Sequence, residues 1–251
     1  MAKTMTRLLA AGSALSALGA ASLFLASTSG SQAAPPAPSE TVHSAPAPQQ
    51  SFMDVKCQPP AEIGPIPQLP PMSWWAPSIS AGASFTPSTT LPTSATTNDG
   101  IIYSHSEEIG SAQGVSLLVG HVDFEPGAIS EDGGELTAWG QLHELSECDL
   151  VFTADENGTV VASQLTSLYT APQFDATLEQ KAAADPGNEE LQSQLQQQGE
   201  VQERVFRSTG SYTITLLTCS GPSVADVGGA FQFRYSDNLI AETTPLDWNQ
   251  L

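Results

Sequence analysis

Short runs of β-branched and apolar residues recur along this chain from about Trp74, and turn residues separate them. The clearest runs are Ser116–Val119, Leu150–Thr153, Ser211–Thr218 and Asn238–Ala241. Runs of this length, bounded by Gly, Asn and Asp, are typical of β-strands. Asn157 and Gly158 lie between two apolar runs, as expected for a hairpin turn. The pattern therefore predicts a compact all-β domain.

One segment, Ala176–Gln202, interrupts the strand pattern because it is rich in Glu, Gln and Ala. Within it, Thr177–Ala184 and Glu189–Gln198 suit helices, and a Pro-Gly pair lies near the middle. Nearly all of its residues are polar, and too few apolar positions recur for a coiled coil. We therefore expect a mobile, exposed helical insertion between two late strands. A shorter helix is predicted at Trp139–Leu145, where large apolar residues recur at helical spacing.

The first residues, Met1–Ala33, have the pattern of an export signal. Lys3 and Arg7 supply a positive start, Leu8–Ala26 carries no charge, and a small-x-small pattern ends at Ala33. We expect cleavage after this segment, and a retained membrane anchor is the alternative. Either outcome predicts an exported protein of the cell envelope or the extracellular space, at the outer face of the plasma membrane.

Residues 34–73 are rich in Pro, Ala, Ser and Gln, a composition that favours extended conformers and buries little surface. We therefore expect a linker here, with the folded domain spanning residues 74–251. The distal part of the linker carries Ile63, Ile66, Leu69 and Met72, which are apolar enough to lie against the domain.

The chain is acidic, with 27 Asp and Glu against 7 Lys and Arg and a net charge of −20. Such a surface repels phosphate backbones and anionic lipid, so we expect no nucleic-acid partner and no membrane contact except through an N-terminal anchor. The acidic residues show no convincing metal-ligand spacing, so no metal and no cofactor are predicted. We expect a soluble monomer beyond the N-terminal segment.

Three cysteines in an exported chain leave one unpaired if the other two are bonded. Cys57 lies in the Pro-rich stretch, and Cys148 lies in a short loop before a strand. A disulfide between them would leave Cys219 free, although the sequence alone does not establish the pairing.

Cys219 follows the predicted strand Tyr212–Thr218 and precedes Ser220, Gly221 and Pro222. Alternation along a strand puts Tyr212, Ile214 and Leu216 on one face, which we assign to the core. Cys219 then falls on the other face, at the end of the strand, where a substrate can reach a thiol. The alternative is a buried or disulfide-bonded cysteine.

A nucleophilic thiol is usually activated by a neighbouring imidazole. Of the four histidines, His43 lies in the linker, His143 in the short helix and His105 in a polar loop. His121 ends an apolar strand directly after Gly120, and is the best partner for Cys219. Acyl transfer also needs a donor for the developing oxyanion. The folded region offers only three arginines for this role, namely Arg204, Arg207 and Arg234.

These residues resemble the sortase family. Thr215–Cys219 matches the sortase signature Thr-Leu-x-Thr-Cys, and Gly120–Asp123 matches the Gly-His-Val-Asp of class F sortases, which are typical of actinobacteria. The segment Ser220–Pro222, with Tyr235 and Asn238 further on, looks like the class F ending. The resemblance covers roughly Trp74–Ala241. It implies a closed, mainly antiparallel barrel of eight strands, with the helical insertion in the loop between strands six and seven, where it helps to shape the substrate groove.

The resemblance also implies a reaction. A sortase cysteine attacks the threonine carbonyl of an LPxTG-like sorting signal, and an amine of lipid II, peptidoglycan or a pilin then resolves the thioacyl intermediate. Carried over to this chain, Cys219 is the nucleophile, His121 the acid-base partner and Arg234 the group that stabilises the carbonyl. Class F members usually carry this arginine directly after the tyrosine, where this chain has Ser236, whereas Arg234 stands just before Tyr235.

Two other functions are compatible with the sequence. The displaced arginine and the acidic insertion suit a sortase-like binding or scaffold protein of the cell envelope that has lost turnover. An exported cysteine hydrolase or an unrelated β-rich surface protein is the second alternative. Leu91–Ala95 superficially suggests a sorting signal, but it lacks the final Gly, a following apolar segment and a basic tail, so we do not expect this chain to be a sorting substrate.

Overall fold

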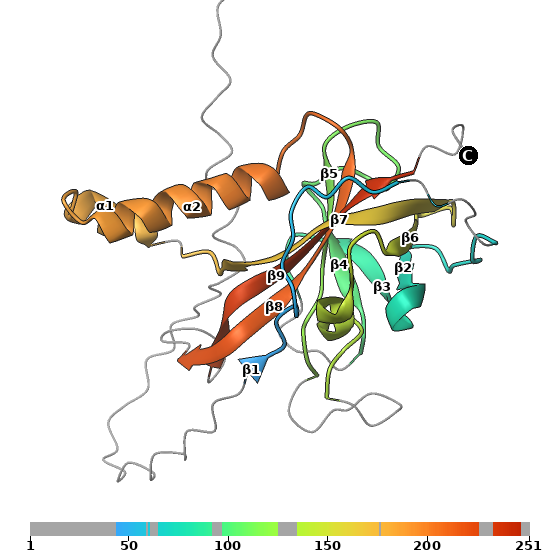
Figure 1. The fold of residues 1–251 in the computed structure, drawn as a ribbon, viewed down its shortest axis with the longest axis horizontal. Helices are drawn as coiled ribbons and strands as arrows, with labels where there is room; N and C mark the ends of the chain where they lie inside the picture. Colours follow the sequence, from blue (N-terminus) through green and yellow to red (C-terminus); the bar gives the residue numbers. More distant parts are fainter. Residues whose placement is uncertain are drawn as a thin grey trace, which may run out of the picture.

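The structure is a computed structural model that describes residues 44–58, 60, 65–91, 97–124, 135–175, 177–225 and 233–246. The predicted export signal at residues 1–33 lies outside these residues. None of the helices in the described ranges is long and apolar enough to cross a membrane. Figure 1 shows a strand-rich body from which a pair of helices projects to one side.

The strands form one sheet that closes into a barrel. In chain order the strands are β1 (Ser44–Ala45), β2 (Ser73–Ala76), β3 (Ala81–Ser88), β4 (Gly100–Tyr103), β5 (Val115–Val119), β6 (Leu150–Ala154), β7 (Val160–Pro172), β8 (Thr213–Ala225) and β9 (Phe233–Pro245). Neighbours follow the order β1-β8-β5-β4-β3-β2-β6-β7-β9, and β8 also pairs with β9. Without β1, the other eight strands therefore form a closed ring. Only β3–β4 and β5–β8 are parallel among these pairs. The predicted closed, mainly antiparallel eight-stranded barrel is confirmed.

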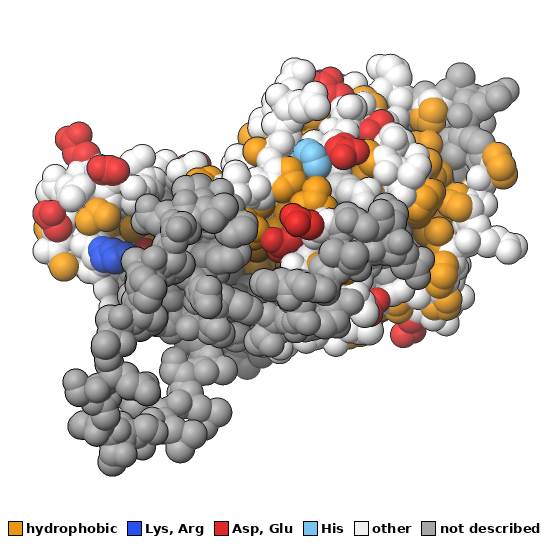
Figure 2. All heavy atoms as spheres, turned by 90° about the horizontal axis from the view of Figure 1, so that it is seen from below, with side chains coloured by type: hydrophobic (Ala, Val, Ile, Leu, Met, Phe, Trp, Pro, Cys, Tyr) orange, Lys and Arg blue, Asp and Glu red, His pale blue; other side chains and the backbone are white. Residues whose placement is uncertain are grey.

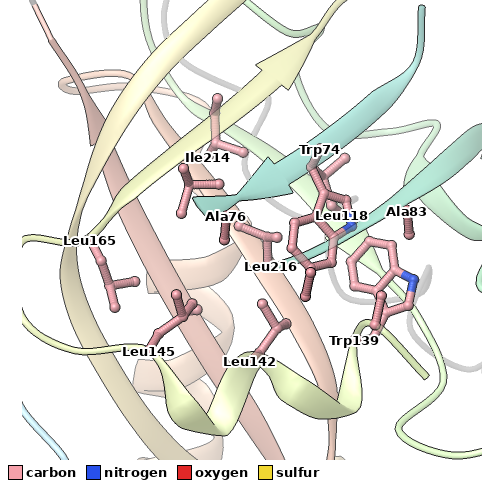
Figure 3. Packing of buried hydrophobic residues seen from close by; sticks show 14 of the residues in the cluster. Trp74, Ala76, Ala83, Leu118, Trp139, Leu142, Leu145, Leu165, Ile214 and Leu216 are labelled. Carbon is pink, nitrogen blue, oxygen red and sulfur yellow. The ribbon is translucent and has the colours of Figure 1, made fainter. Parts of the chain in front are cut away.

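The barrel interior is filled by large apolar side chains from many strands (Figure 3). Ile214 and Leu216 of β8 are fully buried there, as their alternation predicts. Trp74 and Trp139 meet edge to face, with ring centroids 5.3 Å apart. Leu142 packs in the same cluster and lies in the short 3-10 helix η4 (Gly140–Glu144), within the range where the sequence predicts a short helix. A second 3-10 helix, η3 (Pro77–Ile79), connects β2 to β3.

The predicted helical insertion forms two α-helices, α1 (Leu178–Ala184) and α2 (Glu189–Val205), between β7 and β8. Figure 1 shows the pair extending away from the barrel. The C-terminal end of α2 is anchored. Val205 is buried in a cluster with Tyr103 and Ile240, and Val201 packs against the same cluster. The insertion is therefore free at its tip and attached at its base.

An ion network at the base of α2 connects three parts of the chain. Arg204 donates through Nε to Glu242 of β9 at 2.6 Å and through Nη2 to Asp54 at 2.9 Å. The guanidinium also lies over the ring of Tyr169, 5.7 Å from its centroid. These partners raise the pKa of Arg204, chiefly through the Glu242 hydrogen bonds, and the Arg204 hydrogen bond lowers the pKa of Asp54. Arg204 thus joins α2 to the barrel and to the N-terminal segment.

The N-terminal segment Ser44–Cys57, which the sequence predicts to be part of a linker, instead lies along the barrel as a strap. Backbone bonds join Phe52 to Leu168 of β7, and Cys57 forms a disulfide with Cys148. The disulfide and the strand pairing supply the fixed contacts that a Pro-rich composition does not predict. Figure 1 shows this segment rising from β1 past β8 and β9. The pairing of Cys57 with Cys148 leaves Cys219 as a free thiol.

Strand β8 continues beyond Cys219, where the sequence predicts its end. Ser220, Gly221 and Pro222 are strand residues because β9 pairs with Ser220 and β1 pairs with Gly221 and Pro222. An irregularity in the β8–β9 pairing falls between Ser220 and Ser223, and Gly221 has a φ of 79°. The Gly-Pro pair therefore forms a bulge rather than a strand-ending turn. Cys219 lies just before this bulge.

Candidate active site

Cys219 lies on β8, and His121 follows the end of β5, the parallel neighbour of β8. In the β5–β8 pairing Val119 is opposite Leu217, and the backbone N of Gly120 still donates to the carbonyl O of Leu217 at 3.1 Å. His121 is two residues beyond Val119, and Cys219 is two residues beyond Leu217. The parallel register therefore brings these two predicted site residues to one end of the barrel.

The backbone before and after His121 is fixed by close packing. A Cβ on Gly120 would collide with the indole ring of Trp139, so only glycine fits at this position. Thr137 Oγ1 donates to the backbone O of His121, and Thr137 N donates to the backbone O of Val122 at 3.1 Å. Trp139 is the N-cap of η4, and Thr137 lies two residues before it. The segment that leads into η4 therefore fixes the backbone around His121.

Cys219 is a partly buried residue and lies in a mixed environment. Tyr235 and Val122 are buried in a small apolar cluster, and Cys219 packs against it. Burial, together with the negative charge of Asp123, raises the pKa of the Cys219 thiol to about 11. A hydrogen bond from Gln173 Nε2 to Cys219 Sγ, at 3.5 Å, acts in the opposite direction. At neutral pH the resting thiol is therefore protonated.

Asp123 and Tyr235 form a hydrogen-bonded pair beside the thiol. Tyr235 Oη donates to Asp123 Oδ2 at 2.6 Å, and burial and this carboxylate raise the pKa of Tyr235. The two side chains line a cavity of about 100 Å³, together with Ser44, Ala45, Val122, Glu135 and Leu136. The acidic residues give this end of the barrel a negative character. Figure 2 shows acidic side chains spread over the described part of the face seen from below.

The start of the strap forms one wall of this cavity. Ser44 pairs with Pro222 and Ala45 with Gly221, in an antiparallel arrangement. Ser220 Oγ donates to the backbone O of Pro46 at 2.8 Å. Ala45 is 5% exposed and packs in the cluster that Cys219 contacts. Part of the strap therefore lies next to the candidate nucleophile.

Arg234 lies in β9, where its backbone pairs with Val224 of β8. It is four residues from Asn238, the partner of Cys219, which corresponds to about 13 Å along a strand. The side chain of Arg234 lies outside the described part of the structure, as do the residues that follow Phe124 and Ala225. The strand positions place Arg234 on the strand next to Cys219, beyond the bulge.

The other sequence candidates lie away from Cys219. The His105 ring stacks edge-on against Tyr103, 5.4 Å between centroids, near the strand end where β5 begins. His143 Nδ1 lies 2.6 Å from the backbone O of Gly140 within η4. Arg207 donates to Thr213 Oγ1 at 2.9 Å, at the start of β8, and Arg204 belongs to the ion network of α2. None of these four side chains contacts Cys219 in the interactions described.

Gln173 donates a hydrogen bond to the thiol of Cys219, and Tyr235 belongs to the cluster against which Cys219 packs. The sequence analysis gives neither residue a chemical role. Gln173 directly follows β7, and its contact with Cys219 depends on β9 lying between β7 and β8. No local sequence pattern carries that strand order. Tyr235 belongs to the motif in which the sequence resembles class F sortases, so the motif points to it, although without a chemical role.

No protein-family model and no curated protein matches this sequence. Solved structures of sortases are similar in shape. Sortase C1 of Streptococcus agalactiae, in complex with MTSET, is 12% identical, with 70% of this chain and 67% of that chain covered and a TM-score of 0.45. A lid mutant of sortase A from Corynebacterium diphtheriae is 14% identical over 71% of each chain, with a TM-score of 0.42. Sortase C of Clostridium perfringens, solved with the C-terminal cell wall sorting motif, is 11% identical over 70% of this chain and 69% of that chain, with a TM-score of 0.42.

Proposed function

We propose that this protein is a cysteine transpeptidase of the sortase type, most like class F. The motifs Thr215–Cys219 and Gly120–Asp123 support the family, and the closed eight-stranded barrel agrees with it. One observation carries the chemistry. The parallel pairing of β5 with β8, which ends at Val119 opposite Leu217, supports the pairing of His121 with Cys219, a free thiol in a chain whose other two cysteines are joined.

The proposed reaction begins with attack of Cys219 Sγ on the threonine carbonyl of an LPxTG-like sorting signal, while the thiol proton passes to His121. The S–C bond forms, and the carbonyl π electrons move to the oxygen. When these electrons return, the Thr–Gly C–N bond breaks and His121 protonates the leaving amine. The product is a thioester between Cys219 and the threonine.

An acceptor amine then resolves the thioester. The amine attacks the same carbon and gives a proton to His121, the C–S bond breaks, and the thiolate regains its proton from His121. Lipid II, peptidoglycan and a pilin lysine are the proposed acceptors, which fits an exported enzyme of the cell envelope. Arg234 is proposed to hold the substrate carbonyl, because a planar guanidinium is a permanent charged donor. The helical insertion at 176–202 is proposed to flank the substrate groove.

A sortase-like binding protein without turnover is the second candidate, and one observation favours it. Burial and Asp123 raise the pKa of the Cys219 thiol to about 11, so only a small fraction of Cys219 is thiolate at neutral pH. Such a protein would bind sorting signals without forming a thioester. Acylation of Cys219 therefore separates the two functions.

The test is mass spectrometry of the purified protein after incubation with LPxTG-like peptides, with and without hydroxylamine. We expect an acyl adduct on Cys219 without the acceptor and a threonine hydroxamate with it. Cys219→Ala should give neither product while keeping the fold. Peptide binding without either product would favour the binding protein, and a hydroxamate formed equally well by Cys219→Ala would exclude Cys219 as the nucleophile.

A further inference from the structure

Gln173 reaches the candidate nucleophile from the far side of β9. Its backbone N donates to the backbone O of Ser236 at 2.9 Å, and its Nε2 donates to Cys219 Sγ at 3.5 Å. Ser236 is two residues from Asn238, the β9 partner of Cys219. The backbone bond to β9 therefore fixes the point from which the Gln173 amide extends toward the sulfur.

We propose that Gln173 is a catalytic residue whose Nε2–H donates to the oxyanion that forms when Cys219 is acylated. This inference rests on the proposed acyl-transfer function. Side-chain amides are known oxyanion donors, and such donors act at about 2.7–3.1 Å from the oxygen. The inference adds a donor that neither the cysteine motif nor the histidine motif contains.

The geometry of thiol attack supports this role. The new bond joins Sγ to the carbonyl carbon, so the oxyanion lies only two bonds from the sulfur. A donor already in contact with Sγ needs only a small rotation of its side chain to reach that oxygen. Before attack, the amide donates to the sulfur. As the carbonyl π electrons move to oxygen, the amide can follow the negative charge from sulfur to oxygen.

A neutral amide also suits the charges of this site. Asp123 already places a carboxylate near the thiol, and an amide adds no further charge that could titrate. Two arginines with described side chains are engaged elsewhere. Arg204 is bound to Glu242, and Arg207 donates to Thr213, the first residue of β8, six residues before Cys219. Gln173 Nε2, in contrast, donates directly to Cys219 Sγ.

The test compares two reactions of Cys219 in the full chain. Acylation by p-nitrophenyl acetate passes through an oxyanion and needs no sorting signal, whereas alkylation by iodoacetamide forms no oxyanion. We expect Gln173→Ala to slow acylation by on the order of 10²-fold, the scale of one oxyanion donor. Alkylation should change by no more than about threefold, because only one hydrogen bond to the thiolate is lost. Gln192→Ala is the matched control, since its amide donates to Ala182 O within the insertion.

Each outcome decides the role of Gln173. A selective loss of acylation supports it, and Gln173→Glu should lose at least as much, because a carboxylate cannot donate and repels the oxyanion. Equal losses in acylation and alkylation would show that Gln173 acts only on the thiol, and no loss in either would also overturn the proposal. Wild-type protein that accepts p-nitrophenyl acetate but no LPxTG-like peptide would contradict the sortase function while leaving the test of Gln173 intact.

Discussion

Trp139 lies flat enough against Gly120 that its indole ring occupies the space of a Cβ at position 120. The contact joins the start of η4 to the end of β5, one residue before His121. Because both partners lie in a closely packed interior, neither has room to move away. The position of the candidate acid-base residue is therefore set by a tryptophan from another part of the chain.

Gly120→Ala should disturb this contact. The added methyl forces either the indole or the end of β5 to shift, and overpacking of this kind costs about 1–3 kcal/mol. We expect a lower urea midpoint. We also expect slower acylation of Cys219 under conditions where the variant is still folded, because His121 moves with the backbone. Gly199→Ala is the control, since a Cβ there meets nothing within 4 Å and an alanine favours the α2 helix. A silent Gly120→Ala variant would contradict the packing argument.

His121→Ala should lower transpeptidation by at least about 10²-fold, the usual scale for a general acid-base group. His105→Ala should cost far less, because His105 lies against Tyr103 at the other end of β5. Single-turnover kinetics with an LPxTG-like peptide measures both variants. Comparable losses in the two variants would remove His121 from its proposed role.

The reactivity of Cys219 should depend on pH in a defined direction. The thiol pKa is raised from 9.0 to about 11, so the rate of iodoacetamide alkylation should climb until about pH 11. Asp123→Asn removes a negative charge and keeps an oxygen for Tyr235, so the midpoint should move to lower pH. Because the folded pKa is the higher one, the folded state loses stability as pH rises from about 9 to 11. Asp185→Asn is the charge-matched control on the insertion, and an equal shift there would exclude a local effect of Asp123.

Ala45→Glu should expose Cys219. A buried carboxylate next to Asp123 and Glu135 should release the Ser44–Ala45 pairing with β8. Loss of hydrogen bonds worth about 1 kcal/mol each should raise the alkylation rate of Cys219 by about tenfold. Met53→Glu is the matched control, because Met53 is on the same strap and is 51% exposed. An unchanged alkylation rate in Ala45→Glu would show that the strap does not restrict access to the thiol.

The tip of the helical insertion should be removable. The Gln198 side chain exchanges hydrogen bonds with the backbone of Asp175 at 2.9 and 3.3 Å, so the two ends of the insertion lie close together. A short Gly-Ser turn can therefore replace Thr177–Gln198. Arg204 and its network remain, and we expect the thermal midpoint to stay within about 5 °C. The relative kcat/KM for acidic and basic sorting peptides should change, because acidic residues of the insertion are lost. Unchanged ratios would reduce the insertion to a passive loop, and a variant that fails to fold would show that it is part of the core.

The sequence predicts strands correctly where the alternation of residues within the strand defines them. It fails where pairing with a strand far away in the sequence determines the structure. Ile214 and Leu216 alternate into the core as expected, because one face of β8 is fully buried. Gly221 and Pro222 are local turn signals, yet pairing with β1 keeps them in a strand. For the site, the motifs indicate Cys219 and His121 and predict their meeting at strand ends. Gln173 depends on the order of three strands, which no local pattern specifies.

The two ends of the described chain leave the barrel at opposite ends. Ser44 pairs with Pro222, three residues beyond Cys219 in β8. Leu246 N donates instead to Ala162 O near the start of β7, beside the first residues of β8 and away from the thiol. A bead, tag or fused domain attached ahead of Ser44 would therefore crowd incoming peptides. The same cargo attached after Leu246 would stay away from the Cys219 end of the barrel, so immobilisation through the C-terminal side is the preferred format for assays and for ligation reactions.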